Sequence, residues 1–239
     1  MINEPRLLLV DENVNVPASI SKLRNYAKTA LEYGMPISKD ELGRSYVPNG
    51  MGGSDGISSG TGVNVLVLYS ESTYMKIHTH PSGTLASPSP RDLINMYGTI
   101  KYQIDDYQII NMESSIVFAA NGTEYASVVN NITDIQNILI KFMDSKYSDF
   151  KTFFHFTDST DNEFIPRSVW QNLYKDIYTR MKTNVYPDED ANVYALTYII
   201  DQKNMGLKIM KRSSAAGEFR ELKTEYDGNK YIPKICTER

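Results

Sequence analysis

Two of the chain's three histidines stand two positions apart, in the run His-Thr-His-Pro at residues 78–81. Residues 74–80 read as a β-strand, and successive side chains of a strand point to opposite faces of its sheet. His78 and His80 therefore project from the same face, where their imidazoles can bind one metal ion together. Pro81 ends the strand, so the chain must turn directly after the second histidine.

A carboxylate follows at the start of the next predicted element. Seven residues separate this run from Ser89, which is followed by a proline and reads as the N-cap of a helix. Asp92 lies three residues after the cap, in the first helical turn, where it can supply an oxygen ligand. Two imidazoles and one carboxylate leave one tetrahedral position open for water, which is typical of catalytic rather than structural zinc. The sequence therefore predicts a zinc site formed by His78, His80 and Asp92.

A simpler interpretation is that the two histidines share a strand face by chance, and that Ser89 and Asp92 only cap a helix. With average residue usage this combination arises on the order of 10⁻⁷ times per starting position, which favours the metal site. Cys236 is the only cysteine, and a single cysteine excludes an internal disulfide and a thiolate zinc cluster. Imidazole and carboxylate groups must therefore hold the metal.

The composition is that of a globular protein without a membrane or nucleic-acid signature. The 239 residues are 41% hydrophobic and 23% charged, enough to bury a core without help from a metal. The formal net charge of -4 comes with no sustained run of Lys or Arg, which argues against a nucleic-acid surface. No apolar run approaches the roughly 20 residues that span a bilayer, and the chain starts without a signal-type leader. We expect a cytoplasmic protein, or an effector delivered without a classical signal peptide.

The spacing of apolar residues and turn formers predicts an α/β fold. Residues 17–34 carry apolar residues at every third and fourth position, which predicts a helix that Gly34 ends. Residues 49–62 are so rich in Gly and Ser that they read as a long loop. Residues 63–69 read as a strand that forms a hairpin with residues 74–80. The further expected elements are a helix from Ser89 to about Lys101, strands at 107–111, 115–120 and 123–128, helices at 135–143, 169–181 and 191–204, and strands at 207–211, 219–223 and 230–235.

This order of elements predicts two parts. Residues 1–145 form an α/β core with a mixed sheet flanked by helices. Residues 146–239 form a C-terminal extension of helices followed by a small antiparallel β-meander. The helical and hairpin signals of the second part suggest a region appended to the core, and its role is not indicated by any motif.

The histidine run and the Ser-Pro-Arg-Asp segment closely resemble the signature of the JAMM metalloprotease family, also called MPN-type. That signature is His-x-His-Pro, a seven-residue gap and Ser-x-x-Asp, all downstream of a glutamate. The Pro-Ser-Gly continuation at residues 81–83 is similar to the RadC-like bacterial branch. The resemblance is specific over residues 75–94, extends in outline over 18–128, and does not cover the last hundred or so residues. It implies a cytidine-deaminase-like JAMM core in residues 1–145.

The resemblance also implies roles for individual residues. The family's zinc ligands match His78, His80 and Asp92, and the family's serine, which helps to stabilise the tetrahedral oxyanion, matches Ser89. The upstream glutamate acts as general base for the attacking water, which suits a carboxylate because it can accept a proton and pass it to the leaving nitrogen.

Three glutamates are candidates for this base. Glu32 leads the first strand expected after the first long helix, as the family's glutamate does, and we favour it. Glu41 is the alternative, although it sits in what reads as an exposed turn. Glu71 lies in the predicted hairpin just before the histidine strand and reads as solvated.

The function expected from this reading is zinc-dependent hydrolysis of peptide or isopeptide bonds. The expected partner is a protein or peptide substrate, with a ubiquitin-like conjugate as one candidate, and no membrane or nucleic acid. The residues of the motif resemble those of small bacterial or phage effector-type members of the family. Two alternatives remain open: a catalytically silent zinc-containing binding or scaffold protein, and a RadC-like protein of DNA metabolism.

Overall fold

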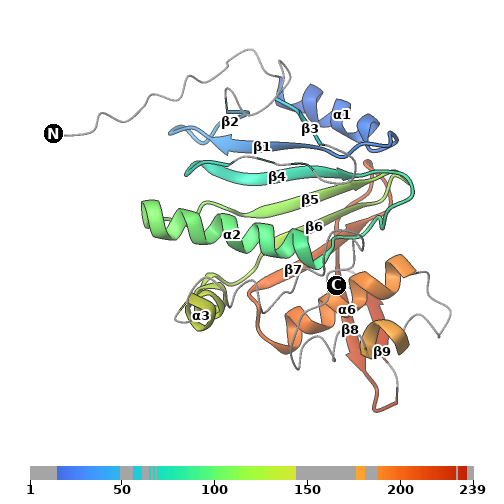
Figure 1. Ribbon diagram of the computed structural model, residues 1–239. Coiled ribbons are helices and arrows are strands. Elements are labelled where there is room, and N and C mark those ends of the chain that lie inside the picture. Colours follow the sequence, from blue (N-terminus) through green and yellow to red (C-terminus); the bar gives the residue numbers. More distant parts are fainter. Residues whose placement is uncertain are drawn as a thin grey trace.

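The computed structural model describes residues 15–48, 56–60, 65, 67, 69–143, 176–180, 188–229 and 231–235. Over these residues the chain forms one open, mixed β-sheet with helices on both of its faces (Figure 1). The helices are α1 (Val16–Tyr26), α2 (Pro90–Tyr107), α3 (Ile132–Met143) and α6 (Asp188–Gln202). The strands are β1 (Tyr33–Lys39), β2 (Ser45–Tyr46), β3 (Ser58–Ser59), β4 (Thr73–His80), β5 (Ser114–Ala119), β6 (Glu124–Val129), β7 (Leu207–Arg212), β8 (Arg220–Tyr226) and β9 (Tyr231–Ile235).

The described strands follow the order β2-β1-β4-β5-β6-β7-β8-β9, and β3 also pairs with β1. Their pairings are antiparallel except for β4 with β5, which run parallel. A parallel pair needs a crossover connection, and α2 supplies it between β4 and β5. The expected α/β fold with a mixed sheet flanked by helices is therefore confirmed, and the sheet is mostly antiparallel.

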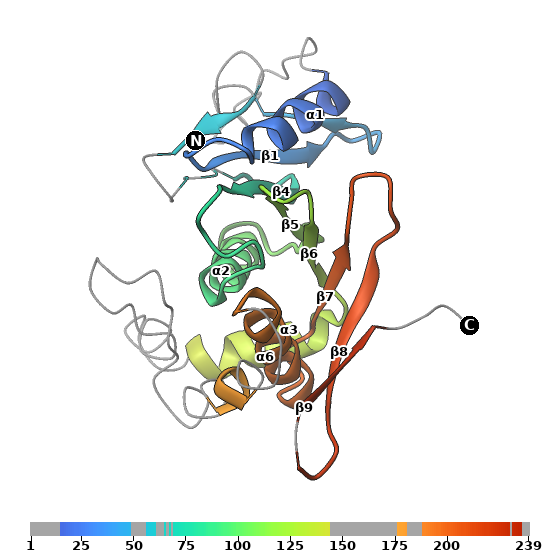
Figure 2. The same ribbon diagram turned by 90° about the vertical axis from the view of Figure 1, so that its right-hand side faces the viewer.

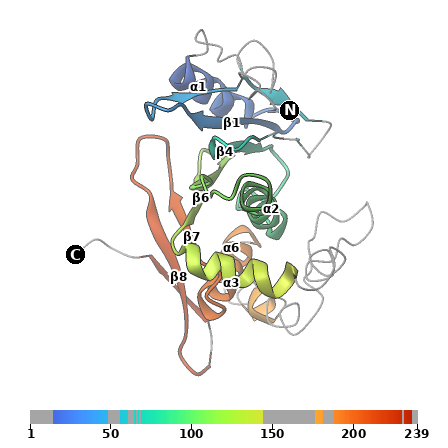
Figure 3. The ribbon, with the colours of Figure 1, turned by 90° about the vertical axis from the view of Figure 1, so that its left-hand side faces the viewer.

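Alternate residues of the central strands pack in different layers. On one face, Ile77 and Phe118 belong to a core that includes Leu23 of α1. On the other face, Val117 and Tyr125 belong to a larger core with residues of α2, α3 and α6. Figure 2 shows these three helices on one side of the sheet, and Figure 3 shows the same grouping from the opposite direction. The two histidines of β4 alternate with Ile77 and so face the layer of α2.

The first helix is shorter than the sequence predicts, and Gly34 has a different role. α1 begins at Val16, close to the expected start at residue 17, with Asn15 as its N-cap, but it ends at Tyr26. Gly34 lies inside β1, where an added Cβ would be 2.3 Å from Cγ2 of Val67 and 3.2 Å from the carbonyl oxygen of Ile77. Close packing within the sheet, and not the end of a helix, therefore explains this glycine.

The predicted hairpin between residues 63–69 and β4 is wrong. Both edges of β4 are occupied, one by β1 and the other by β5, and a strand has only two edges for hydrogen bonding. Of the 63–69 segment the structure describes residues 65, 67 and 69, none of which lies in a strand. The side chains of Val65 and Val67 lie next to Gly34 of β1, where an added Cβ would be 3.2 and 2.3 Å from them.

The segment predicted as a long loop, residues 49–62, contains a short strand. Ser58–Ser59 forms β3 and pairs with Tyr33–Gly34 at the start of β1. Composition could not reveal it, because two residues can pair through their backbone groups alone. Outside residues 56–60, this predicted loop lies beyond the described residues.

α2 begins where the sequence predicts but runs past the expected end to Tyr107. The strand predicted at 107–111 is therefore wrong. The backbone N–H groups of residues 111 and 112 both donate to the side-chain oxygen of Gln103, at 3.0 and 2.9 Å, instead of to a neighbouring strand. A buried side chain of the helix thus accepts the hydrogen bonds of the backbone N–H groups that follow the helix.

The C-terminal elements largely follow the prediction. α6 ends before Gly206, which has a φ of 71°, and the three meander strands are formed as β7, β8 and β9. This meander extends the main sheet, because β7 pairs with β6. Of the helix predicted at 169–181, residues 176–180 are described and helical. The predicted division at residue 145 lies outside the described residues and stays a prediction.

Among the described residues, no helix is both long and apolar enough to cross a bilayer.

Polar side chains of α2 lie along β4. The amide of Gln103 donates to the carbonyl oxygen of Thr73 at 2.8 Å, and the hydroxyl of Thr99 accepts from the amine of Lys76 at 2.8 Å. At the start of the helix, Asp92 reaches the histidine end of the strand. α2 therefore runs antiparallel to β4, and its N-terminus lies over the two histidines.

Lys76 is buried beneath α2, and burial lowers its pKa from the ordinary value of 10.5 to about 7. Between these values the unfolded chain binds a proton that the folded chain does not. Stability must therefore rise with pH in this window, by up to about 1.4 kcal/mol per pH unit, and fall as pH decreases toward the folded-state pKa. We expect Lys76→Met to remove this slope and to stabilise the protein near neutral pH.

Urea unfolding measures the free energy of unfolding of the wild type and of Lys76→Met as a function of pH. The measurements are made with a chelator present, from about pH 7 to about pH 10. The same pH dependence in both proteins would show that Lys76 does not cause the slope.

Candidate metal site

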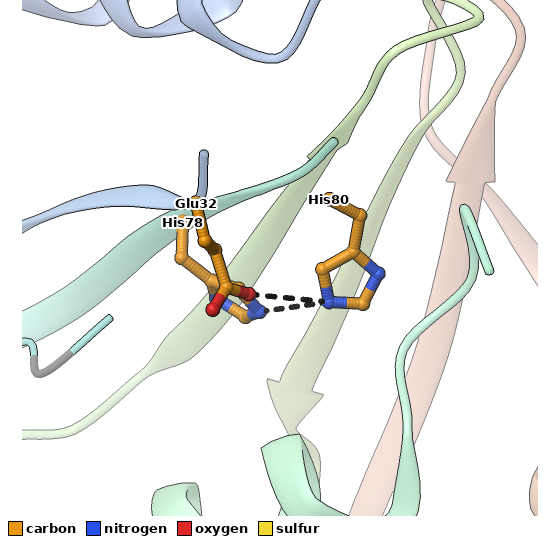
Figure 4. A group of neighbouring side chains, drawn as sticks. All are labelled: Glu32, His78 and His80. Atoms are coloured by element: carbon orange, nitrogen blue, oxygen red, sulfur yellow. Dashed lines mark hydrogen bonds and ion pairs between the residues drawn. The ribbon is translucent and has the colours of Figure 1, made fainter. Parts of the chain in front are cut away.

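The pleat of β4 brings two imidazoles together. His78 and His80 are both buried, and their Nε2 atoms, which a dashed line joins in Figure 4, lie 3.2 Å apart. Nitrogen ligands about 2.0 Å from a zinc ion lie about 3.3 Å apart at the corners of a tetrahedron. The observed separation therefore fits two ligands of one ion.

The ring of His80 is held in the tautomer that a metal ligand needs. Its Nδ1 lies 2.7 Å from the carbonyl oxygen of Leu85. A carbonyl can only accept, so Nδ1 carries the proton and the Nε2 of the neutral ring keeps its lone pair. Such a backbone partner also orients a metal-binding imidazole. The contact thus presents Nε2 of His80 to the side where His78 lies.

Asp92 reaches the two histidines from the first turn of α2. Its Oδ1 lies 3.0 Å from Nε2 of His78, and its Oδ2 lies 3.6 Å from Nε2 of His80. Both distances are close to the spacing of about 3.3 Å between ligands of one tetrahedral ion. The structure therefore brings together the three side chains that the sequence predicts as ligands.

Ser89 fixes the Asp92 carboxylate. The backbone N–H and the hydroxyl of Ser89 both donate to Oδ2 of Asp92, at 2.6 and 2.8 Å, and the N–H of Asp92 donates back to the Ser89 hydroxyl at 3.3 Å. These reciprocal bonds form a capping box, here with Asp in the third position. The hydroxyl proton of Ser89 therefore goes to Asp92 in this structure, and the predicted oxyanion role of Ser89 stays a prediction.

Glu32 completes the group from the segment that leads into β1. It is buried, and its Oε1 lies 3.9 Å from Nε2 of His80 (Figure 4). Glu32, His78 and His80 form a buried group that could hold a metal ion, since one ligand atom from each lies within 4.8 Å of the other two. The sequence predicts Glu32 only as a general base and does not reveal that its carboxylate could also help to hold a metal ion. No local pattern signals it, because the position of Glu32 depends on the pairing of β1 with β4.

The two other candidate glutamates lie far from the histidines. Glu41 is exposed in the turn after β1, and Glu71 lies in the turn before β4. β1 and β4 are antiparallel, with Ser38 opposite Thr73 and Gly34 opposite His78, so both glutamates are at the end of the pair opposite to the site. A strand rise of about 3.3 Å per residue makes that separation about 15 Å. Among the three candidates, the structure brings Glu32 alone to the histidines.

The buried carboxylates and imidazoles change one another's pKa. Burial raises the pKa of Glu32, and the two histidines offset only part of this rise. Burial by itself also raises the pKa of Asp92, but His78 and His80 outweigh it and hold that pKa well below its usual range. Burial opposes the charged form of His78, yet Asp92 and Glu32 raise the pKa of His78 overall. The group therefore favours a positive charge at its centre, as a proton or as a metal cation.

No protein-family model, curated protein or solved structure matches the chain. The chemistry and geometry of this site are therefore what indicates a function.

We expect the protein to bind one divalent transition-metal ion per chain. His78→Ala removes a ligand and should weaken the affinity by more than about 100-fold, the upper end of what the loss of an outer partner costs. Competition with a chromogenic chelator measures the affinity. Glu41→Gln, a carboxylate change at the far end of the same strand pair, is the matched control and should bind as the wild type does. Equal affinity in His78→Ala and the wild type would contradict this site.

Proposed function

We propose that the protein is a zinc-dependent hydrolase of the JAMM type that cleaves peptide or isopeptide bonds. The observation that carries the proposal is the arrangement of four side chains. His78, His80 and Asp92 have the spacing of ligands to one ion, while the carboxylate of Glu32 lies slightly farther out. Three ligands and a nearby carboxylate base are what metal-assisted hydrolysis of an amide requires.

The donor set fits zinc. Two neutral imidazoles and one carboxylate are common zinc ligands, and three protein ligands leave a fourth position for water or substrate. The hydrogen bond from Nδ1 of His80 to the Leu85 carbonyl and the bonds from Ser89 to Asp92 supply the outer contacts that orient such ligands. When bound, zinc supplies a Lewis acid that polarises a carbonyl group and makes water more acidic.

Glu32 is the general base in this proposal. Its carboxylate is 3.9 Å from Nε2 of His80, beyond the ligand spacing of about 3.3 Å but within reach of a water between them. Burial raises the pKa of Glu32, which makes this carboxylate a stronger proton acceptor than an exposed one. Glu32 takes a proton from the attacking water and delivers it to the leaving nitrogen, so its charge is restored at the end of the cycle.

Ser89 has two roles in the proposed mechanism. Its hydroxyl and N–H hold Asp92 through the capping box. During the reaction the hydroxyl rotates to donate a hydrogen bond to the developing oxyanion of the substrate, while the N–H keeps its bond to Asp92. The capping box can tolerate this exchange because two donors share the same carboxylate oxygen.

The order of elements supports the family assignment. From α1 to β6 the chain runs helix, strand, histidine strand, helix, strand, strand, apart from the two-residue strands β2 and β3. The helix that follows the histidine strand carries the serine and the aspartate at its first turn. We assign this part of the chain to a cytidine-deaminase-like JAMM core, and the substrate to the class of proteins or peptides, including ubiquitin-like conjugates.

The test of this function is Glu32→Gln. The variant keeps the size of the side chain but cannot accept a proton, so we expect amide cleavage to fall by about 10²–10⁴-fold. The zinc content should stay at the wild-type value, because the ligands are intact. Cleavage is measured on fluorogenic peptides and on isopeptide-linked conjugates of a ubiquitin-like protein, with zinc measured by elemental analysis.

Glu41→Gln serves as the control and should cleave at the wild-type rate. Wild-type cleavage by Glu32→Gln would assign the base to another residue. Zinc-loaded wild type that cleaves none of these substrates would favour a binding protein over an enzyme.

A further inference from the structure

One loop connects two of the proposed ligands. The site loop, residues 81–89, leaves β4 directly after His80 and ends at the N-cap of α2, three residues before Asp92. Near its middle, the Leu85 carbonyl accepts the Nδ1–H of His80. At its end, Ser89 holds the Asp92 carboxylate with two hydrogen bonds. The position of the site loop therefore sets the orientation of both ligands.

The site loop is held from a distant part of the chain. Asn192, in α6, is 2% exposed, and its Nδ2 donates to the Ser87 hydroxyl at 2.8 Å and to the Pro88 carbonyl at 2.9 Å. Ser87 itself is fully buried. These two bonds join residues more than a hundred positions apart at the point where the loop turns into α2.

Other contacts hold α6 against α2 and the site loop. Ala86 of the site loop, Leu93 of α2 and Ala191 of α6 belong to the same buried core. The hydroxyl of Tyr97 in α2 donates to the carbonyl of Met205, just after α6. α6 is therefore packed firmly against α2, and the side chain of Asn192 forms the hydrogen bonds between α6 and the site loop.

We propose that Asn192 is a positioning residue of the metal site, through which α6 orients the loop that connects two of the ligands. This inference rests on the proposed function, because it concerns the same zinc ligands. A side-chain amide suits the position, since one nitrogen carries two N–H donors and two buried acceptors need them. Removing it leaves the Ser87 hydroxyl and the Pro88 carbonyl to find other partners, and the loop shifts to do so. His80 and Asp92 then lose the orientation that matches one ion.

The inference predicts that Asn192→Ala weakens zinc affinity by about 10–100-fold, as the loss of other outer contacts of a metal site does. Ser87→Ala removes one of the two bonds and should weaken the affinity by about 5-fold. The double variant should bind no more weakly than Asn192→Ala, because both changes break the same link. Affinity is measured by competition with a zinc chelator, and melting temperatures are measured in excess chelator.

Thr224→Val is the matched control. The hydroxyl of Thr224 is buried and donates to the Tyr194 carbonyl at 2.9 Å, so the variant loses a buried contact of α6 that does not lead to the site loop. We expect it to lower the melting temperature while zinc affinity stays within about 2-fold of the wild type.

The measured affinities and melting temperatures decide whether Asn192 positions the metal site or only stabilises the fold. Wild-type zinc affinity in Asn192→Ala, with a lowered melting temperature, would overturn the inference and leave Asn192 a structural residue. Should Asn192→Ala fail to fold, Ser87→Ala decides, and unchanged affinity in that variant also overturns it. Absence of zinc binding by the wild type would remove the proposed function and this inference together, whereas zinc binding without amide cleavage would remove only the former.

Discussion

The capping box between Ser89 and Asp92 connects the start of a helix to the proposed chemistry. One oxygen of Asp92 accepts two hydrogen bonds from Ser89 and so helps to begin α2, while the other lies 3.0 Å from His78. The same interaction therefore stabilises the helix and directs a carboxylate at the histidines. The rest of the site depends on it, because α2 is the crossover that allows β5 to lie parallel to β4 and covers the face on which the histidines lie.

The charges in this region favour a bound cation. Two carboxylates, Glu32 and Asp92, lie beside two imidazoles in a largely buried setting, where unpaired charge is costly. A divalent ion neutralises both carboxylates and leaves the imidazoles uncharged. Among the described residues, Glu32, His78 and His80 form a group that could hold one ion, and oxygens of Asp92 lie 3.0 and 3.6 Å from the Nε2 atoms of the two histidines. Either protons or a divalent cation can therefore offset the two carboxylates.

Local patterns predicted part of this structure well. The alternation of side chains in a strand put His78 and His80 on one face, and the Ser-Pro sequence at residue 89 predicted the start of α2 because an N-cap is a property of a few neighbouring residues. The mixed sheet, α6 and the C-terminal meander were likewise readable from periodicity and turn residues. The error at 63–69 had a non-local cause, since both edges of β4 are taken by β1 and β5.

The remaining features depend on contacts that no local pattern records. The choice of Glu32 over Glu41 follows from the antiparallel register of β1 and β4, in which Gly34 lies opposite His78. Asn192 had no signature at all, because an asparagine inside a helix is unremarkable until its partners in the site loop are known. Residues whose roles come from long-range pairing are therefore the ones that sequence reasoning misses.

Anomalous X-ray diffraction at the zinc edge, from crystals of the zinc-loaded protein, locates the ion and identifies its ligands. The proposed site predicts one ion at about 2.0–2.2 Å from Nε2 of His78, Nε2 of His80 and one oxygen of Asp92, with the carboxylate of Glu32 outside the coordination sphere. An ion held by Glu32 in place of Asp92, or bound away from the two histidines, would contradict it.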